Sequence, residues 1–141
     1  MRFLIFLLLT TIFEIVESDN LKIVKDFEAK MIALREAKNY TAIQQNLDRD
    51  FYFFFQLQPH LDTHCVGGLQ YFMDRLTNHT CLMFDYFNPK VDPTIWPPID
   101  NFGVLWVTYP PQSDGKLFSY IISRKSKTDD YKFKHYFYDW K

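Results

Sequence analysis

Glycine is scarce in this chain of 141 residues, which contains only Gly67, Gly68, Gly103 and Gly115. A loop that cradles phosphate groups needs closely spaced glycines, because the backbone itself must approach the ligand. The four glycines form no such loop. The sequence therefore predicts no nucleotide site, and no cofactor is expected.

A surplus of basic charge is also missing, since 16 Lys and Arg residues face 17 Asp and Glu residues. A nucleic-acid-binding protein carries a basic excess on one face. The densest basic stretch, residues 124–134, is interrupted by Asp129 and Asp130. This stretch is typical of a solvated hairpin tip, and no nucleic-acid partner is expected.

The chain has no apolar run of the length that spans a bilayer. Spanning needs about 20 predominantly apolar residues, whereas the run over residues 3–13 is followed by Glu14 and Glu17. A basic second residue and small residues near position 18 predict that residues 1–18 are a secretory signal peptide. We expect a secreted, extracellular chain of residues 19–141 that forms one domain, with no stable membrane insertion after cleavage.

Cysteine is limited to Cys65 and Cys81. An even count in an exported chain favours a disulfide, which would stabilise the fold by about 3 kcal/mol. A helix is expected between the two cysteines and could hold the sulfur atoms apart, because bridged Cα atoms approach to about 4.4 to 6.8 Å.

Histidines beside these cysteines raise the alternative of a zinc site. His64 adjoins Cys65, and His79 lies two residues before Cys81. Structural zinc pairs are separated by two to five residues, and adjacent residues of an extended segment point apart. No metal site is predicted. A cysteine nucleophile is also not predicted, because neither cysteine lies in a known catalytic signature.

Aromatic residues, by contrast, are abundant, with 24 among the 123 residues after position 18. They favour half-buried pleated surfaces and fill interiors and interfaces.

Apolar spacings of three and four predict helices over residues 19–38, 41–47 and 68–77. A polar turn at 48–50 and a loop over 89–100 are expected, and runs rich in strand-forming residues predict strands over 51–57, 81–87, 102–109, 116–124 and 131–140. The first of these strands is expected to have both faces covered.

This order of elements predicts an α+β fold with helices on one face of an antiparallel sheet. The first helix, followed by Asn-Tyr-Thr-Ala-Ile at 39–43 and Asp-Phe-Tyr-Phe at 50–53, resembles the nuclear transport factor 2-like domains of the cystatin-like group. The resemblance covers residues 19–141. It implies a curved antiparallel sheet that forms a cone around two or three N-terminal helices, with a mouth that can hold a small apolar ligand.

That family includes dehydratases, isomerases, polyketide cyclases and non-catalytic association modules, so the fold alone does not select a function. Phe53, Trp106, Tyr120 and His135 lie mid-strand and are expected to line the pocket. A one-residue shift in register would send each side chain to the opposite face.

An enzyme of this family would need a base and a proton donor in apolar surroundings. The strand residues available are Tyr52, Asp85, Tyr120 and His135. None lies in a motif of a catalytic member, so no catalytic residue is predicted.

Three further surface features are expected. Asn39 and Asn78 begin Asn-x-Thr sequons and are predicted glycosylation sites. The strand over 102–109 is apolar on both faces, so its outer face is expected to pair with a second copy as a homodimer. The proline-rich segment over 89–98 could cover the mouth of the cone or the sheet edge.

The leading interpretation is a secreted, non-catalytic module that binds a small apolar ligand or a protein partner. The alternatives are a dehydratase-, isomerase- or cyclase-type enzyme and a purely structural dimerisation module. The interior of the cone discriminates between them. Two convergent titratable groups would favour the enzyme, an apolar cavity a carrier, and a filled interior the interaction module.

Overall fold

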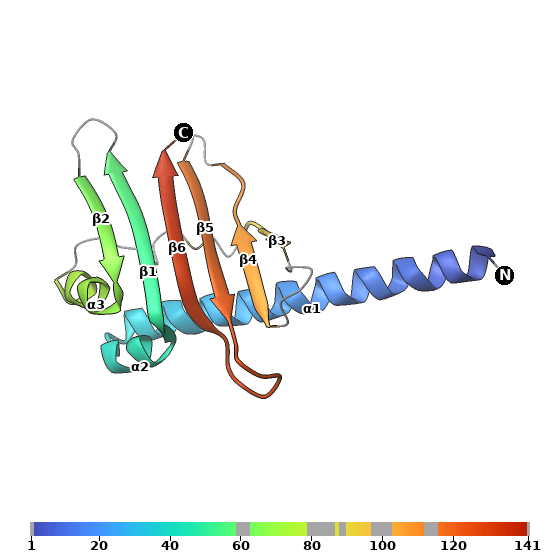
Figure 1. Ribbon diagram of the computed structural model, residues 1–141, viewed down its shortest axis with the longest axis horizontal. Coiled ribbons are helices and arrows are strands. Elements are labelled where there is room, and N and C mark those ends of the chain that lie inside the picture. The colour runs from blue at the N-terminus through green and yellow to red at the C-terminus, as the bar shows by residue number, and fades with distance from the viewer. Residues whose placement is uncertain are drawn as a thin grey trace.

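The computed structural model describes residues 2–58, 63–78, 87, 90–96, 103–111 and 116–140. Its helices are α1 (Arg2–Glu36), α2 (Tyr40–Gln45) and α3 (Leu69–Thr77). Its strands are β1 (Leu47–Gln58), β2 (Thr63–Gly68), β3 (Thr94–Trp96), β4 (Val104–Thr108), β5 (Lys116–Ser123) and β6 (Lys132–Trp140). The sheet lies across α1 (Figure 1), which confirms the predicted α+β class.

The six strands follow the order β2-β1-β6-β5-β4-β3 in one open sheet. Four neighbouring pairs are antiparallel, but β1 and β6 are parallel. The expectation of a purely antiparallel sheet is therefore corrected. The first and last strands become neighbours because the chain passes through α3 and the far half of the sheet before it returns beside β1 (Figure 1).

Strand β1 begins earlier than the sequence predicted and buries only one face. Residues 48–50, expected to form a turn, belong to the strand. Phe51 and Phe53 are buried, whereas Tyr52 between them is 42% exposed. The prediction that both faces are covered is wrong, because the described helices lie on one side of the sheet and alternate side chains point to opposite faces.

Two strands had no clear signal in the sequence. Strand β3 is only three residues long and lies inside the expected loop over 89–100. Strand β2 covers a segment that contains two glycines and for which no strand was predicted. Each is added at a sheet edge by pairing with a longer neighbour, β4 or β1. The strand expected over 81–87 lies outside the described residues except for Phe87, which is buried in the core.

Helix α1 is continuous through the predicted cleavage position after Ser18, and its N-terminal part projects beyond the sheet (Figure 1). Lys38, in a left-handed conformation with φ of 53°, follows the end of the helix. Asn39 then caps α2, because its side chain accepts a hydrogen bond from the Ala42 backbone amide at 3.2 Å. In the described part of the chain, no helix combines the length and apolar content needed to cross a membrane.

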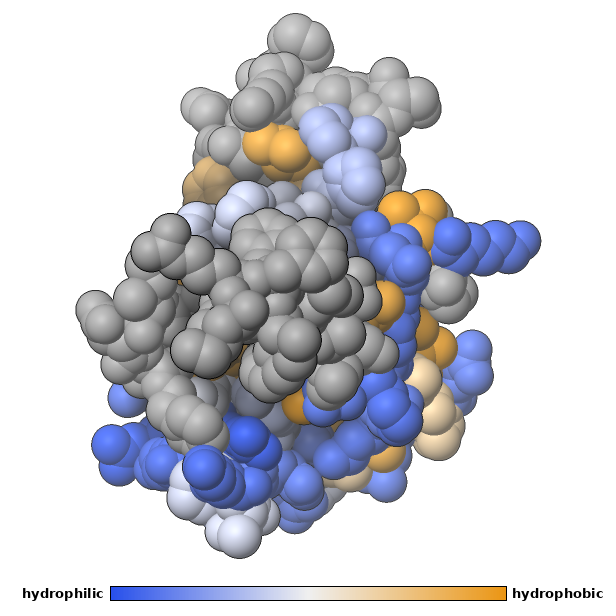
Figure 2. All heavy atoms as spheres, turned by 90° about the vertical axis from the view of Figure 1, so that its right-hand side faces the viewer, coloured by the Kyte–Doolittle hydropathy of each residue, from blue (hydrophilic) through white to orange (hydrophobic). Residues whose placement is uncertain are grey.

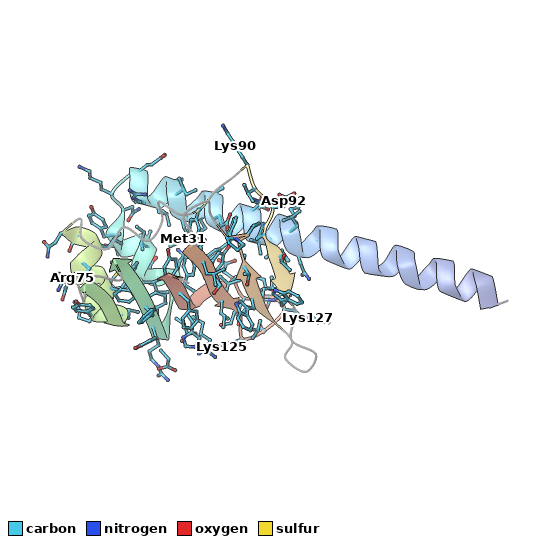
Figure 3. All side chains as sticks on the ribbon, turned by 90° about the horizontal axis from the view of Figure 1, so that it is seen from above. Met31, Arg75, Lys90, Asp92, Lys125 and Lys127 are labelled. Atoms are coloured by element: carbon cyan, nitrogen blue, oxygen red, sulfur yellow. The ribbon has the colours of Figure 1, made fainter. Side chains whose placement is uncertain are left out.

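The core lies between the helices and the inner face of the sheet and is rich in aromatic rings. Phe27 of α1 meets Phe133 edge to face, with ring centroids 4.7 Å apart. Phe72 of α3 contacts Phe51 and Phe53 in the same way. Met31 points from α1 toward the sheet (Figure 3) and is fully buried. These contacts attach α1 and α3 to the same face of the sheet.

Candidate functional site

A buried carboxylate lies between α1 and the inner face of the sheet. Glu28 of α1 is only 3% exposed. The Tyr109 hydroxyl donates to both carboxylate oxygens, at 2.6 Å to Oε1 and 2.7 Å to Oε2. The Tyr120 hydroxyl donates to Oε1 at 2.5 Å. We call these three residues the Glu28 cluster. It joins α1, β5 and the residue that follows β4.

The environment of the Glu28 cluster shifts its proton equilibria. Burial raises the pKa of Glu28, while the hydrogen bonds from the tyrosines and the charge of Lys25 oppose that shift. Burial and the neighbouring carboxyl group raise the pKa of both Tyr109 and Tyr120. Both tyrosines therefore keep their protons at neutral pH and act as hydrogen-bond donors.

Lys25 connects the cluster to the segment before β3. Its ammonium group donates to the Val91 carbonyl at 2.6 Å and lies 3.7 Å from the Asp92 carboxylate. The same ammonium group lies 5.7 Å from the centre of the Tyr109 ring. Asp92 stands beside α1 in Figure 3. Residues 91–92 are thus held against α1 next to the cluster.

Aromatic side chains fill the space around the Glu28 cluster. The Tyr109 ring stacks on Phe118, with centroids 5.2 Å apart, and Phe118 also contacts Tyr136 at 5.1 Å. Phe87 contacts Tyr120 at 5.5 Å. A general base needs space for substrate within hydrogen-bond reach. In this arrangement the oxygens of Glu28 face the two tyrosine hydroxyl groups.

The four predicted pocket residues lie on two different faces of the sheet. Phe53 and Tyr120 are buried on the inner face. Trp106 is 49% exposed on the outer face, and His135 pairs with the outer residue Tyr52. The structure therefore does not bring the four side chains together. The sequence shows that alternate residues of each strand point to opposite faces. It does not show which of the two sets of residues faces the core.

The residues of the outer face form an aromatic-rich row that crosses five strands. Successive strand pairs align Trp96 with Trp106, Trp106 with Ile121, Ile121 with His135, and His135 with Tyr52. We call these five residues the outer row. Trp96 is 58% exposed and Phe137, two residues after His135, is 37% exposed. Directly paired residues share a face, so the row is one continuous surface.

His135 lies within the outer row. Its Nδ1 atom is buried without a hydrogen-bond partner among the described residues. Burial and then the charge of Lys134 lower the pKa of this imidazole. The ring lies 6.1 Å from the ring of Phe137. His135 is therefore neutral at pH 7 and contributes a ring rather than a charge to the row.

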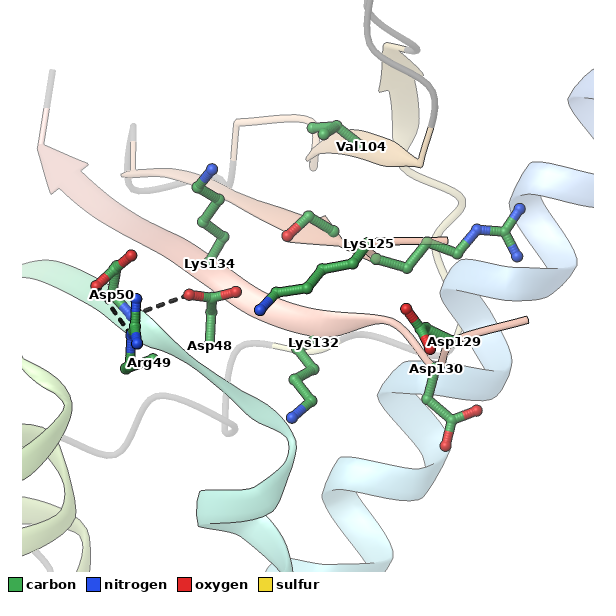
Figure 4. A pocket seen from close by; sticks show the side chains of 11 residues that line it. Asp48, Arg49, Asp50, Val104, Lys125, Asp129, Asp130, Lys132 and Lys134 are labelled. Carbon is green, nitrogen blue, oxygen red and sulfur yellow. Dashed lines mark hydrogen bonds and ion pairs between the residues drawn. The ribbon is translucent and has the colours of Figure 1, made fainter. Parts of the chain in front are cut away.

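A charged hollow of about 800 Å³ lies on the outer face near the β5–β6 hairpin (Figure 4). Its floor includes Val104 and Ser123, which pair across β4 and β5. We call it the lysine hollow, because three lysines from the hairpin and β6 line it, Lys125, Lys132 and Lys134. The remaining lining residues are Asp48, Arg49, Asp50, Arg124, Asp129 and Asp130.

The predicted modification sites stay predictions. Asn39 and Asn78 are exposed at helix ends on the helical side of the sheet. Cys65 belongs to β2, and Cys81 lies outside the described residues. Asp85 lies there too. Among the residues that were described, no group of three His, Cys, Asp or Glu side chains could hold a metal ion.

Glu28 and Tyr109 were not identified from the sequence, although a signal was available. Val24, Phe27 and Met31 form the apolar stripe of the first helix, and Glu28 is four residues after Val24. It therefore lies on the apolar side of the helix, where a carboxylate needs a buried partner. Which tyrosines meet it depends on contacts between residues 81 and 92 positions apart.

No family model matches this chain, and no curated protein matches it either. A variant of the protein Rd1NTF2_05 has 8% identity, a TM-score of 0.46, and coverage of 88% of this chain and 96% of its own. A structure titled for an enumerative algorithm for de novo design of proteins with diverse pocket structures has 16% identity, a TM-score of 0.40, and coverage of 82% and 96%. Apart from the parallel β1–β6 pair, the helix-backed sheet described above has the arrangement that the resemblance to nuclear transport factor 2-like domains implied.

Proposed function

We propose that this chain is a secreted, non-catalytic interaction module that binds a second copy of itself through the outer face of its sheet. The outer row is the observation that carries the proposal. It presents Trp96, Trp106 and Tyr52 to solvent on one continuous surface. Tryptophan and tyrosine are the side chains that most often dominate the binding energy of protein interfaces.

The size of this face supports a protein contact. Six paired strands span five spacings of about 4.8 Å, roughly 24 Å in width. Exposed apolar patches of several hundred Å² on soluble proteins mark interaction sites. Both expected glycan sites lie on the helical side of the sheet, at the ends of α1 and α3, so neither would cover the row.

A second copy is the preferred partner for two reasons. A two-fold contact uses the same patch on both subunits, and a row of exposed rings can pack against its own copy without a matching cavity. The formal net charge of the chain is −1, so long-range repulsion between copies is weak. The position of neutral His135 within the row is also compatible with burial at such a contact.

The filled interior argues against the small-ligand alternative. Phe53, Phe118, Tyr120 and Tyr136 occupy the space between the sheet and the helices, each with at most 1% exposure. A carrier site is normally a preformed cleft of several hundred Å³. A fluorescent apolar probe should accordingly show no saturable binding to the native protein.

An enzyme remains the second candidate function, because the Glu28 cluster joins a carboxylate to two hydroxyl donors. In enzymes that hold a carboxylate and hydroxyl donors in an apolar site, these groups exchange protons with the substrate. It would require residues 91–92 to move away from α1 and admit a substrate. Saturable probe binding that is lost in Glu28→Gln would favour this candidate over the interaction module.

Light scattering of the purified mature chain at micromolar concentration tests self-association. We expect a dimer mass for the wild type and a monomer for Trp106→Arg, because a buried interface arginine without a partner is costly. Loss of an aromatic hot spot weakens association by about 2 kcal/mol or more, roughly 30-fold in Kd. Ala33→Arg places the same residue on the exposed side of α1 and should remain a dimer. A monomeric wild type at these concentrations would overturn the proposal.

A further inference from the structure

The lysine hollow shares no lining residue with the outer row or with the Glu28 cluster. A bulge in β6 helps to form it, since Ile121 pairs with His135 but Ile122 pairs with Phe133, which leaves Lys134 as the extra residue. A bulge re-aims the side chains on its strand. Lys132 and Lys134 therefore both contribute to the hollow, and Lys125 reaches it from the hairpin (Figure 4).

These lysines are available for a ligand. The ammonium groups of Lys125, Lys132 and Lys134 make no hydrogen bond or ion pair with the rest of the described chain. An ammonium group is a strong donor to phosphate and carboxylate oxygens, with three protons to offer. Three ammonium groups line one concave surface, and the protein itself does not use their N–H donors.

The acidic residues of the hollow neutralise part of this charge. Asp50 lies 3.9 Å from the Arg49 side chain. Asp129 and Asp130 belong to the hairpin tip, on the side of the hollow away from Lys134 (Figure 4). Asp48 alone stands among the lysines, with one oxygen accepting from the Asp50 backbone amide at 2.9 Å. Over the whole lining, five basic side chains face four acidic ones, which leaves an excess of one positive charge.

We propose that the lysine hollow binds a sulfate or phosphate group carried by a larger ligand. A sulfate, or a phosphate monoester near neutral pH, carries one to two negative charges and three free oxygens, which match the excess charge and the donors. A hollow of about 800 Å³ has the volume of a small-molecule site and exceeds that of a bare ion. The rest of the ligand lies against Val104 and toward Trp106, two residues farther along β4.

Titration of the purified chain with inorganic sulfate, inorganic phosphate and a sulfated disaccharide tests this site by calorimetry at low salt. We expect saturable binding of the disaccharide that is tighter than that of either free ion. Lys134→Gln should weaken it roughly fivefold, as expected for one solvent-accessible ion pair. Lys30→Gln, an exposed lysine on α1, should leave it unchanged.

Asp48→Asn is a variant that should have the opposite effect on ligand binding. It keeps the oxygen that accepts from the Asp50 amide but removes the negative charge among the lysines. Binding should therefore become roughly fivefold tighter. Equal weakening by Lys134→Gln and Lys30→Gln, or no response to Asp48→Asn, would show non-specific attraction and overturn the site. Tighter binding of phosphate than of the sulfated sugar would assign it to phosphate esters.

Discussion

Glu28 shows how a single residue can join distant parts of this fold. Its carboxylate accepts hydrogen bonds from Tyr109 and Tyr120, and these bonds fix α1 against two adjacent segments of the sheet. Burying a carboxylate is costly unless its oxygens are paired. Here the tyrosine donors satisfy both oxygens. Nevertheless, the ionised form remains less favoured than in water, because the pKa of Glu28 is raised by its burial.

The raised pKa of Glu28 predicts an unusual pH dependence of stability. Between the ordinary value of 4.5 and the higher pKa in the folded chain, the folded state holds more protons than the unfolded state. The contribution of Glu28 is therefore fully present below pH 4.5 and is lost as pH rises through the folded-state pKa. A tenfold change in the proton dissociation constant of this carboxyl group on folding would correspond to about 1.4 kcal/mol of stability.

Urea unfolding of the wild type and Glu28→Gln across pH 4 to 8 measures this contribution. The glutamine approximates the neutral acid and cannot ionise. We expect the wild type to lose stability relative to Glu28→Gln as pH rises, with the other carboxylates common to both proteins. Parallel pH profiles for the two proteins would mean that burial does not shift the pKa of this carboxyl group.

At the scale of the element, the turn before β4 requires a backbone conformation that favours glycine. Gly103 has a φ of +90°, where an L side chain is strained. A Cβ atom there would also lie 2.8 Å from the Arg124 carbonyl oxygen. The Gly103 carbonyl accepts from the Arg124 amide at 2.8 Å, so the turn is tied to the end of β5.

Gly103→Ser should therefore destabilise the fold by about 1 to 3 kcal/mol, measured from the urea midpoint and slope. Gly68→Ser is the matched control. Gly68 has φ of −89° at the N-cap of α3, and an added Cβ would approach the Phe51 carbonyl oxygen only to 3.6 Å. Serine favours this position, so the control should be neutral or slightly stabilising. Equal losses in both variants would argue against strain at Gly103.

At the scale of the whole molecule, the part of α1 that follows residue 18 packs into the core. Val24, Phe27 and Met31 of α1 are buried members of this core. The part of α1 that projects past the sheet in Figure 1 is its N-terminal end. Figure 2 looks toward that end and shows hydrophobic residues in small groups among hydrophilic ones. We expect residues 19–141 to form the folded domain, as one domain of ordinary size.

N-terminal sequencing of exported protein should locate the start of the chain near Asp19. The leader has the basic start, apolar centre and small residues near its end that signal peptidase substrates share. Urea unfolding of a chain that starts at Asp19 should be cooperative, because it retains the buried residues Val24, Phe27 and Met31 of α1. An exported chain that still contains residues 3–13 would instead indicate anchoring by the first helix.

Intact mass before and after alkylation without reductant tests the Cys65–Cys81 disulfide. We expect no added mass in exported protein, because an even cysteine count in an oxidising compartment favours the bridge. Reduction should then lower stability by about 3 kcal/mol. Two alkylated thiols in native exported material would exclude the bridge and leave both cysteines as free thiols.

Local patterns in the sequence determined the helices and the longer strands of this protein. Helix α3 covers residues 69–77, where apolar spacing predicted a helix over 68–77. Such a pattern depends on the periodicity of one segment, so it needs no knowledge of the remaining chain. The α+β class followed from the order of these segments in the same way.

The tertiary structure decided which segments meet and which way their side chains face. The parallel β1–β6 pair, the short edge strand β3 and the outward position of Trp106 all depend on contacts with remote segments. The Glu28 cluster required three segments to be packed together before its hydrogen bonds could be identified. An alternating strand pattern is compatible with either face toward the core, and only packing against α1 and α3 selects one.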